Sequence, residues 1–348
     1  MKRILVTGGA GFVGSSIALS LKDRYENLDV VVLDNLWRRG SERNLPRLAA
    51  KGITFQCGDV RQKSDLEAVG KFDFLFECSA EPSVLAGADG NLDYVIQTNL
   101  QGAINCAEVC RQNNAGMSFL STSRVYSIKT LAGAAIDEKD SRYEFSLGQK
   151  SAGISSLGVS EECSTTGFKS FYGASKYAAE NILEEYRELF DWPIIINRCG
   201  LLSGPGQFGK ADQGIIPFWI KSHIEQKSLK YIGFNGSGKQ LRDVLHINDL
   251  IDLLFLQMEN PEKFNNGVYN VGGGYNNSFS LCELTKICQD VTGKTLAVKE
   301  QKEQRYADIP VYLTNNAKIE QRSGWKVKIN VEEIVLDVYN WLQHFKKG

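Results

Sequence analysis

The sequence lacks the closely spaced histidine and cysteine pairs that are typical of metal sites. It contains only three histidines, and no two of them form an H-x-x-x-H pair. None of its eight cysteines forms a C-x-x-C pair, so neither a zinc site nor a disulfide framework is indicated. Cys106 and Cys110 lie four residues apart in a helical pattern, and we expect them to pack as small apolar side chains. We predict no bound metal.

An excess of one charge and a long apolar run are both missing. Forty Lys and Arg against 41 Asp and Glu leave a formal net charge of −1, which excludes a generally basic nucleic-acid-binding protein and a polybasic membrane-surface protein. No apolar run reaches the roughly 18 residues that a membrane helix needs. The apolar part of the N-terminus, residues 4–6, is too short for the core of a signal peptide. We expect a cytoplasmic protein that binds neither nucleic acid nor membrane.

The sequence does contain a regular alternation of strand and helix patterns. Hydrophobic residues make up 43% of the chain and charged residues 23%, which is the mix of an ordinary globular enzyme. Helical patterns separate six strand-like apolar runs, at residues 4–6, 29–33, 53–56, 72–78, 117–122 and 193–197. This alternation predicts an α/β fold with a Rossmann-type, doubly wound parallel sheet.

The pattern changes after about residue 200, where glycine-rich and aromatic segments replace the regular alternation. We therefore predict two domains. Residues 1–200 form the doubly wound sheet, and the chain returns to it near residues 241–275. Residues 201–348 form a smaller C-terminal domain that binds the substrate.

Residues 7–14, TGGAGFVG, follow the first strand pattern and open a helical pattern. Gly9, Gly11 and Gly14 satisfy the G-x-G-x-x-G spacing, which lets a pyrophosphate approach the backbone N–H groups at a helix N-terminus. Asp34 ends the next strand pattern, twenty residues after Gly14. A carboxylate there accepts hydrogen bonds from both adenosine-ribose hydroxyls and repels a 2′-phosphate. We predict that the chain binds NAD rather than NADP.

Tyr172 and Lys176 form a Y-x-x-x-K spacing at the start of a helical pattern. Residues four apart share one helix face, so the lysine ammonium would favour the phenolate and lower the tyrosine pKa from its usual value near 10. Such a tyrosine takes a proton from an alcohol while a hydride leaves for nicotinamide. A hydroxyl run at residues 121–123 ends a strand pattern fifty residues earlier. From it we select Thr122 as the donor to the reacting oxygen, with Ser123 as the alternative.

Taken in order along the chain, these motifs resemble the extended short-chain dehydrogenase/reductase family. The resemblance covers nearly the whole chain and includes LDN at 33–35, GDVR at 58–61, TN at 98–99, STSRVY at 121–126, YGASK at 172–176 and RDVLHINDL at 242–250. It implies an NAD-dependent nucleotide-sugar enzyme, with residues 1–200 binding NAD and residues 201–348 binding the nucleotide sugar. The catalytic residues it implies are Tyr172, Lys176 and Thr122.

The same resemblance implies two sets of binding residues. Those for NAD are Gly8, Gly11, Phe12, Val13, Gly14, Asp34, Asn35, Asp59, Val60, Asn99, Tyr172 and Lys176, of which Asp59 and Val60 would flank the adenine and Asn99 would support the lysine. Those for the nucleotide sugar are Gln240, Arg242 and Arg305. The two arginines are candidates for the diphosphate, because a guanidinium grips phosphate oxygens bidentately.

Three segments are more particular, namely DNLWRRGSERNL at 34–45, ADQGIIPFWI at 211–220 and GSGKQLRDVLHINDL at 236–250. Together they resemble the CDP-paratose 2-epimerases, a branch of the family that inverts C2 of a CDP-linked dideoxyhexose. The resemblance implies a tightly held NAD that is reduced and reoxidised within one turnover. It also implies a homo-oligomer, dimer or tetramer, and a role in O-antigen or other surface-glycan synthesis.

Other functions stay open at this point. A UDP-hexose 4-epimerase would use the same tyrosine at C4. A 4,6-dehydratase is disfavoured, because the dehydratases of this family carry Asp-Glu where this chain has Ser123 and Arg124. A non-catalytic NAD-sensing protein could share the fold. The chain also departs from the family at residues 77–80, where Glu-Cys-Ser-Ala replaces the usual histidine-containing strand end.

Overall fold

The computed structural model describes residues 1–88, 90–209, 213–265 and 267–345. Ala211 and Asp212 of the ADQGIIPFWI segment lie outside the described residues. The chain folds as two compact units. The first unit comprises residues 1–122, 171–198 and 251–268, and the second comprises residues 123–170, 199–250 and 269 onward.

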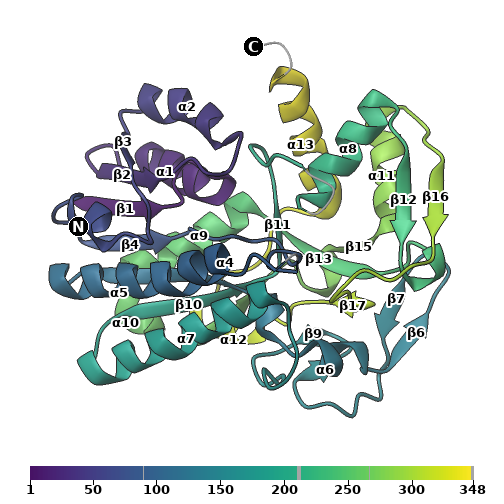
Figure 1. Ribbon diagram of the computed structural model, residues 1–348. Coiled ribbons are helices and arrows are strands. Elements are labelled where there is room, and N and C mark those ends of the chain that lie inside the picture. Colours follow the sequence, from purple (N-terminus) through teal and green to yellow (C-terminus); the bar gives the residue numbers. More distant parts are fainter. Residues whose placement is uncertain (89, 210–212, 266, 346–348) are drawn as a thin grey trace. The chain divides into compact units, whose positions relative to one another are not determined.

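A seven-stranded sheet, built mainly from the first unit, has the strand order β14-β10-β5-β4-β1-β2-β3. Figure 1 shows its strands β4, β1, β2 and β3 in this order. Its strands are β1 (Arg3–Thr7), β2 (Asp29–Asp34), β3 (Thr54–Cys57), β4 (Phe74–Glu77), β5 (Gly116–Thr122), β10 (Ile194–Cys199) and β14 (Val268–Val271). β1 pairs in parallel with both β2 and β4. The strand order therefore reverses beside β1, where doubly wound sheets bind their ligands at the carboxyl ends of the strands. The predicted sheet is confirmed.

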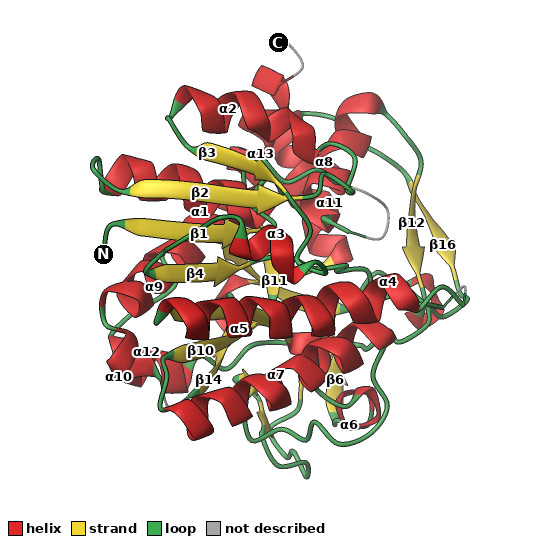
Figure 2. Cartoon of the chain, turned by 60° about the vertical axis from the view of Figure 1, so that its left-hand side comes forward, coloured by secondary structure: helices red, strands yellow, loops and turns green. Residues whose placement is uncertain are grey.

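Helices cover both faces of this sheet (Figure 2). On one face, α3 (Lys63–Glu67), α5 (Gly102–Asn113) and α7 (Phe171–Phe190) bury a large apolar cluster that includes Leu5 and Phe119. On the other face lie α1 (Phe12–Arg24) and α9 (Ile247–Glu259). Because both faces are covered, the strands are continuous apolar runs such as Ile4 to Val6, rather than alternating ones.

The helical segment between β4 and β5 is divided into three pieces. These are α4 (Asp93–Ile96), a π-helical turn η2 (Gln97–Gln101) and α5. The amide of Asn99, inside the π turn, donates to Ser175 Oγ at 3.0 Å and to Glu81 O at 3.1 Å. These two tertiary contacts accompany the local widening of the helix. Such π turns occur most often at functional sites.

The second unit contains a small sheet covered by three helices. The sheet consists of β11 (Leu201–Ser203), β13 (Leu241–His246), β15 (Ser278–Ser280) and β17 (Val311–Tyr312). Apolar side chains of α8 (Ile215–Glu225), α11 (Leu281–Thr292) and α13 (Val331–Phe345) form its main core.

The remaining elements are short. They are α2 (Leu45–Ala50), α6 (Ile128–Ala132), α10 (Pro261–Phe264), α12 (Ala317–Ser323), the pair β12 (Leu229–Ile232) and β16 (Val298–Gln301), and the hairpins β6 (Ile136–Glu138) with β7 (Tyr143–Phe145) and β8 (Ile154–Ser155) with β9 (Gly158–Val159). Within the described residues, no helix combines the length and apolar character needed to span a bilayer.

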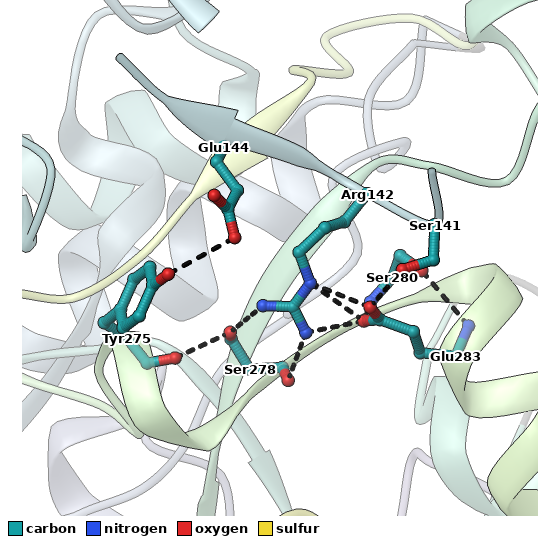
Figure 3. Close-up of polar contacts among 7 residues, drawn as sticks. All are labelled: Ser141, Arg142, Glu144, Tyr275, Ser278, Ser280 and Glu283. Atoms are coloured by element: carbon teal, nitrogen blue, oxygen red, sulfur yellow. Dashed lines mark hydrogen bonds and ion pairs between the residues drawn. The ribbon is translucent and has the colours of Figure 1, made fainter. Parts of the chain in front are cut away.

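Residues 123–170, which the sequence groups with the first two hundred residues, belong to the second unit. Long-range polar contacts hold them there. Figure 3 shows the Arg142 guanidinium between Ser278 and Glu283, and its Nη2 lies 2.6 Å from Glu283 Oε2. The second unit is therefore no smaller than the first. The chain returns to the first unit at residues 251–268.

Candidate active site

The glycine turn joins β1 to α1 and leaves no room for side chains. Gly8 has a φ of +60°, and a Cβ built on it would lie 2.7 Å from the carbonyl oxygen of Cys78. A Cβ on Gly14 would overlap the Gly8 backbone. Gly11 is the N-cap residue of α1 and has no side chain to cap the first turn. A bare helix N-terminus against a close-packed glycine turn fits the diphosphate of a dinucleotide.

Asp34 ends β2 beside this turn, and its carboxylate holds the local backbone. Oδ2 accepts a hydrogen bond from Ala10 N at 3.1 Å, and Oδ1 accepts one from Leu36 N at 2.8 Å. Burial raises the pKa of Asp34, and these backbone donors oppose that rise. A carboxylate has about four acceptor positions, and the backbone donors do not fill all of them, so Asp34 retains the capacity to accept a hydrogen bond from a ribose hydroxyl.

Asn35 and Asp59 are joined directly. Asn35 Nδ2 donates to Asp59 Oδ2 at 2.8 Å, and Arg61 Nη2 lies 2.7 Å from the same oxygen. Burial opposes ionisation of Asp59, but the Arg61 and Asn35 donors hold its pKa below the usual value. Val60 is buried, and its carbonyl accepts from Asn105 Nδ2 at 2.8 Å. The structure therefore brings Asn35 and Asp59 together and places Val60 against α5.

An aromatic stack that was not predicted from the sequence lies next to these residues. The Trp37 ring is stacked on Tyr94 with centroids 5.2 Å apart, and the Arg61 guanidinium lies 4.9 Å from the Tyr94 centroid. Trp37 N also donates to Asn35 Oδ1 at 3.0 Å. Trp37 is 66% exposed. The sequence did not indicate this stack, because Trp37 lies in a loop and its partner Tyr94 lies on a distant segment of the chain.

Tyr172 is the second residue of α7, and Lys176 follows one turn later. The Lys176 side chain is buried, and its ammonium lies 4.1 Å from the centroid of the Phe119 ring. Phe119 lies on β5, three residues before Thr122, which ends that strand. The structure therefore brings the lysine to the strand that carries the predicted hydroxyl.

Asn99 supports the start of α7. Its amide donates to Ser175 Oγ at 3.0 Å, and Ser175 Oγ donates to the carbonyl oxygen of Tyr172 at 2.9 Å. Asn99 Oδ1 also accepts from Glu81 N at 2.8 Å. These bonds join the π turn, the segment after β4 and the first turn of α7, so they help to position the tyrosine.

Arg242 and Arg305, predicted to bind the substrate, both belong to the second unit, and only the backbone of Arg305 is bonded to the partner of Arg242. Arg242 Nη2 donates to Asp308 Oδ1 and to Ile309 O, each at 2.7 Å. Asp308 N donates to Arg305 O at 3.4 Å. Burial lowers the pKa of Arg242 to about 10, so the guanidinium stays charged at neutral pH. Asp308 was not predicted from the sequence as the partner of Arg242.

Gln240, two residues before Arg242 on the same segment, is buried. Its amide Nε2 donates to Ile232 O at 3.1 Å. Its Oε1 is also buried and has no hydrogen-bond partner among the residues that the structure describes. Because an unpaired buried acceptor is destabilising, this oxygen is suited to accept a hydrogen bond from a ligand.

The reversing sheet, the glycine turn and the Tyr172–Lys176 pair define a dinucleotide-dependent α/β enzyme. Residues 4–272 match the model of the NAD dependent epimerase/dehydratase family, and the chain belongs to this family. It is an enzyme, and NAD is its cofactor. The family predicted from the motifs, and NAD predicted from the glycine turn and Asp34, are both confirmed.

Several relatives are similar over almost their full length. A CDP-paratose 2-epimerase from Salmonella typhi is 31% identical over 97% of this chain and 98% of its own. A UDP-glucose 4-epimerase from Pisum sativum is 26% identical over 99% of this chain and 96% of its own. The solved structure of the Thermus thermophilus UDP-glucose 4-epimerase in complex with NAD has a TM-score of 0.77 and 25% identity, covering 98% of this chain and 99% of that one.

Proposed function

We propose that this chain is a nucleotide-sugar epimerase that inverts C2 of a CDP-linked dideoxyhexose, the reaction of a CDP-paratose 2-epimerase. The placing of Tyr172 and Lys176, one helical turn apart in the unit that holds the glycine turn, carries the proposal. The 31% identity to the Salmonella typhi enzyme, against 26% for the Pisum sativum 4-epimerase, supports the choice of C2 and of CDP.

The proposed proton transfers involve three side chains. Tyr172 removes the C2 hydroxyl proton, Lys176 stabilises the phenolate, and Thr122 donates a hydrogen bond to the reacting oxygen. The glycine turn would hold NAD, which would supply the acceptor for the C2 hydride and then its donor. The planar 2-keto sugar turns over before the return, and Tyr172 then restores the hydroxyl proton. No external reductant is consumed.

The predicted binding residues keep their roles in this proposal. The glycine turn with Phe12 and Val13 holds the NAD diphosphate, Asp34 and Asn35 hold the adenosine ribose, and Asp59 and Val60 flank the adenine. Gln240, Arg242 and Arg305 bind the nucleotide sugar, with Asp308 orienting the Arg242 guanidinium. Cytoplasmic location, a homo-oligomer and a role in surface-glycan synthesis stay predictions.

A dehydratase reaction is disfavoured by the residues after Thr122. Expelling water needs a general acid and a general base next to the threonine. Ser123 and Arg124 occupy these positions, and a guanidinium keeps its protons at any physiological pH. An epimerase, which removes and restores one hydroxyl proton, needs no such pair.

Substrate labelled with deuterium at C2 should be turned over with a primary isotope effect, because the bond from C2 to hydrogen breaks. The measurement is the rate with CDP-paratose labelled at C2 against the unlabelled sugar, without added NAD. The matched control is the same sugar labelled at C4, which should react at the unlabelled rate. An isotope effect at C4 instead, seen with UDP-hexoses, would identify a 4-epimerase.

Trp37→Ala should speed the loss of NAD by about tenfold, because an aromatic stack contributes up to about 1.5 kcal/mol. The stack adjoins the predicted adenosine site, because the Arg61 guanidinium that lies over the Tyr94 ring is also paired with Asp59. The NAD remaining after extended dialysis measures the loss. Phe190→Ala is the control, since Phe190 is also exposed and has the Arg111 guanidinium 5.3 Å from its centroid. Equal NAD retention in the two variants would remove the stack from the cofactor site.

A further inference from the structure

Glu77 is a buried carboxyl group in the middle of the seven-stranded sheet. It is the last residue of β4 and pairs with Thr7 of β1 on one side and Phe119 of β5 on the other. Its side chain is 1% exposed. Oε2 lies 3.5 Å from the ammonium of Lys176, and Oε1 accepts from Ser79 N at 2.9 Å.

The groups that surround Glu77 come from four elements. Lys176 from α7 is the charged one among the described residues in contact with it, and Phe119 from β5 lies under the same ammonium. Cys106 from α5 contributes a thiol whose pKa is raised first by burial and further by the charge of Glu77. Thr7 from β1 contributes a hydroxyl that donates to Phe76 O.

The ion pair has a direct effect on the proposed chemistry. Burial raises the pKa of the Glu77 carboxyl, and the Lys176 ammonium and the Ser79 N–H oppose that rise. The ionised carboxylate is stable in this environment only because it is paired, and its partner is the lysine that is proposed to stabilise the Tyr172 phenolate. The carboxylate favours the protonated lysine, which keeps the ammonium in place. The same negative charge opposes formation of a second negative charge on the phenol.

We propose that Glu77 is a positioning residue that holds the Lys176 ammonium against Phe119 and sets the pH range in which Tyr172 acts as a base. The proposal rests on the proposed function of Tyr172 and Lys176. The proposal goes beyond that function, because it assigns a role to Glu77. This carboxylate would influence the protonation of both Lys176 and Tyr172.

Removal of the negative charge makes it easier for both neighbouring groups to lose a proton. In a profile of kcat against pH, the acid limb reports formation of the phenolate and the alkaline limb reports loss of the ammonium. Glu77→Gln should therefore move both limbs to lower pH.

The experiment compares kcat against pH for the wild-type holoenzyme, Glu77→Gln and Glu77→Asp. Glu77→Asp keeps the charge and should restore most of the wild-type profile. Glu283→Gln removes a carboxylate from the ion pair with Arg142 in the second unit and should leave the profile unshifted. A lower kcat at every pH with unshifted limbs would mean a purely structural ion pair and would overturn the proposal.

A second measurement does not depend on the sugar. The ultraviolet absorbance of phenolate is followed against pH in the NAD-bound protein, and the same titration in a Tyr172→Phe background is subtracted. The Tyr172 phenolate should form at lower pH in Glu77→Gln. If this shift occurs but no nucleotide sugar is turned over, the proposed function fails and the role of Glu77 stands. If Glu77→Gln does not fold, the phenolate titrations of Glu77→Asp and Glu77→Ser are compared instead. Identical titrations in these two variants would reject the proposed role of Glu77.

Discussion

Tyr172→Phe should reduce the rate of epimerisation by about 10³-fold, because the loss of a positioned general base removes 10²- to 10⁴-fold of catalysis. The ring remains, so the start of α7 and its bond from Ser175 Oγ to the Tyr172 carbonyl are kept. NAD should stay bound. The measurements are kcat at saturating CDP-sugar and the NAD content of the purified protein after denaturation.

Tyr177→Phe is the matched control, since Tyr177 is a half-buried tyrosine on the same helix, five residues further on. It should retain wild-type turnover. Near-normal rates for Tyr172→Phe would reject its role as the base. A protein that retains NAD but turns over no sugar in either form would instead favour the non-catalytic NAD-sensing alternative.

Asp34→Ala should weaken NAD binding by about 100-fold, because two hydrogen bonds to a charged group contribute roughly 1.5 kcal/mol each. It also removes the acceptor of Ala10 N and Leu36 N, which holds the glycine turn. The charge that repels a 2′-phosphate is lost as well, and the exposed Arg38 and Arg39 follow in the same loop. The preference for NAD over NADP should therefore fall.

Titration of the apoprotein with NAD and with NADP measures both effects. Asp34→Asn separates them, since an amide oxygen still accepts one backbone hydrogen bond but carries no charge. We expect it to lose cofactor preference with a smaller loss of NAD affinity. An unchanged preference in both variants would contradict the assignment of Asp34 to the ribose.

The sheet, the glycine turn and the helix with Tyr172 and Lys176 were predictable because each depends on short-range pattern. Val30 to Leu33 is apolar along its whole length, as a strand covered on both faces must be. Gly8 has a positive φ, and backbone atoms of Cys78 leave no space for a Cβ at this position. Because only glycine fits such a position, the glycine in the sequence indicates the turn directly. Tyr172 and Lys176 are one helical turn apart, so helix geometry alone aligns them.

Two features of the candidate site could not be predicted in this way. The sequence showed that residues 77–80 differ from the usual pattern of the family. The Glu77 carboxylate reaches Lys176, however, only because α7 packs over β4 and β5. The predicted diphosphate ligand Arg242 is bonded to Asp308, which lies sixty-six residues later. Neither pairing follows from spacing, since each joins elements that are brought together by core packing.

By itself the sequence determined the class of this protein, namely an NAD-dependent enzyme with a doubly wound sheet, because local periodicity and motif spacing report backbone conformation. The tertiary structure alone decided which side chains act on one another: Glu77 with Lys176, Trp37 with Tyr94, and Arg142 with Glu283. The reason is physical. Charge and stacking interactions act over a few ångströms in space, and the distance between two residues along the chain does not determine that separation.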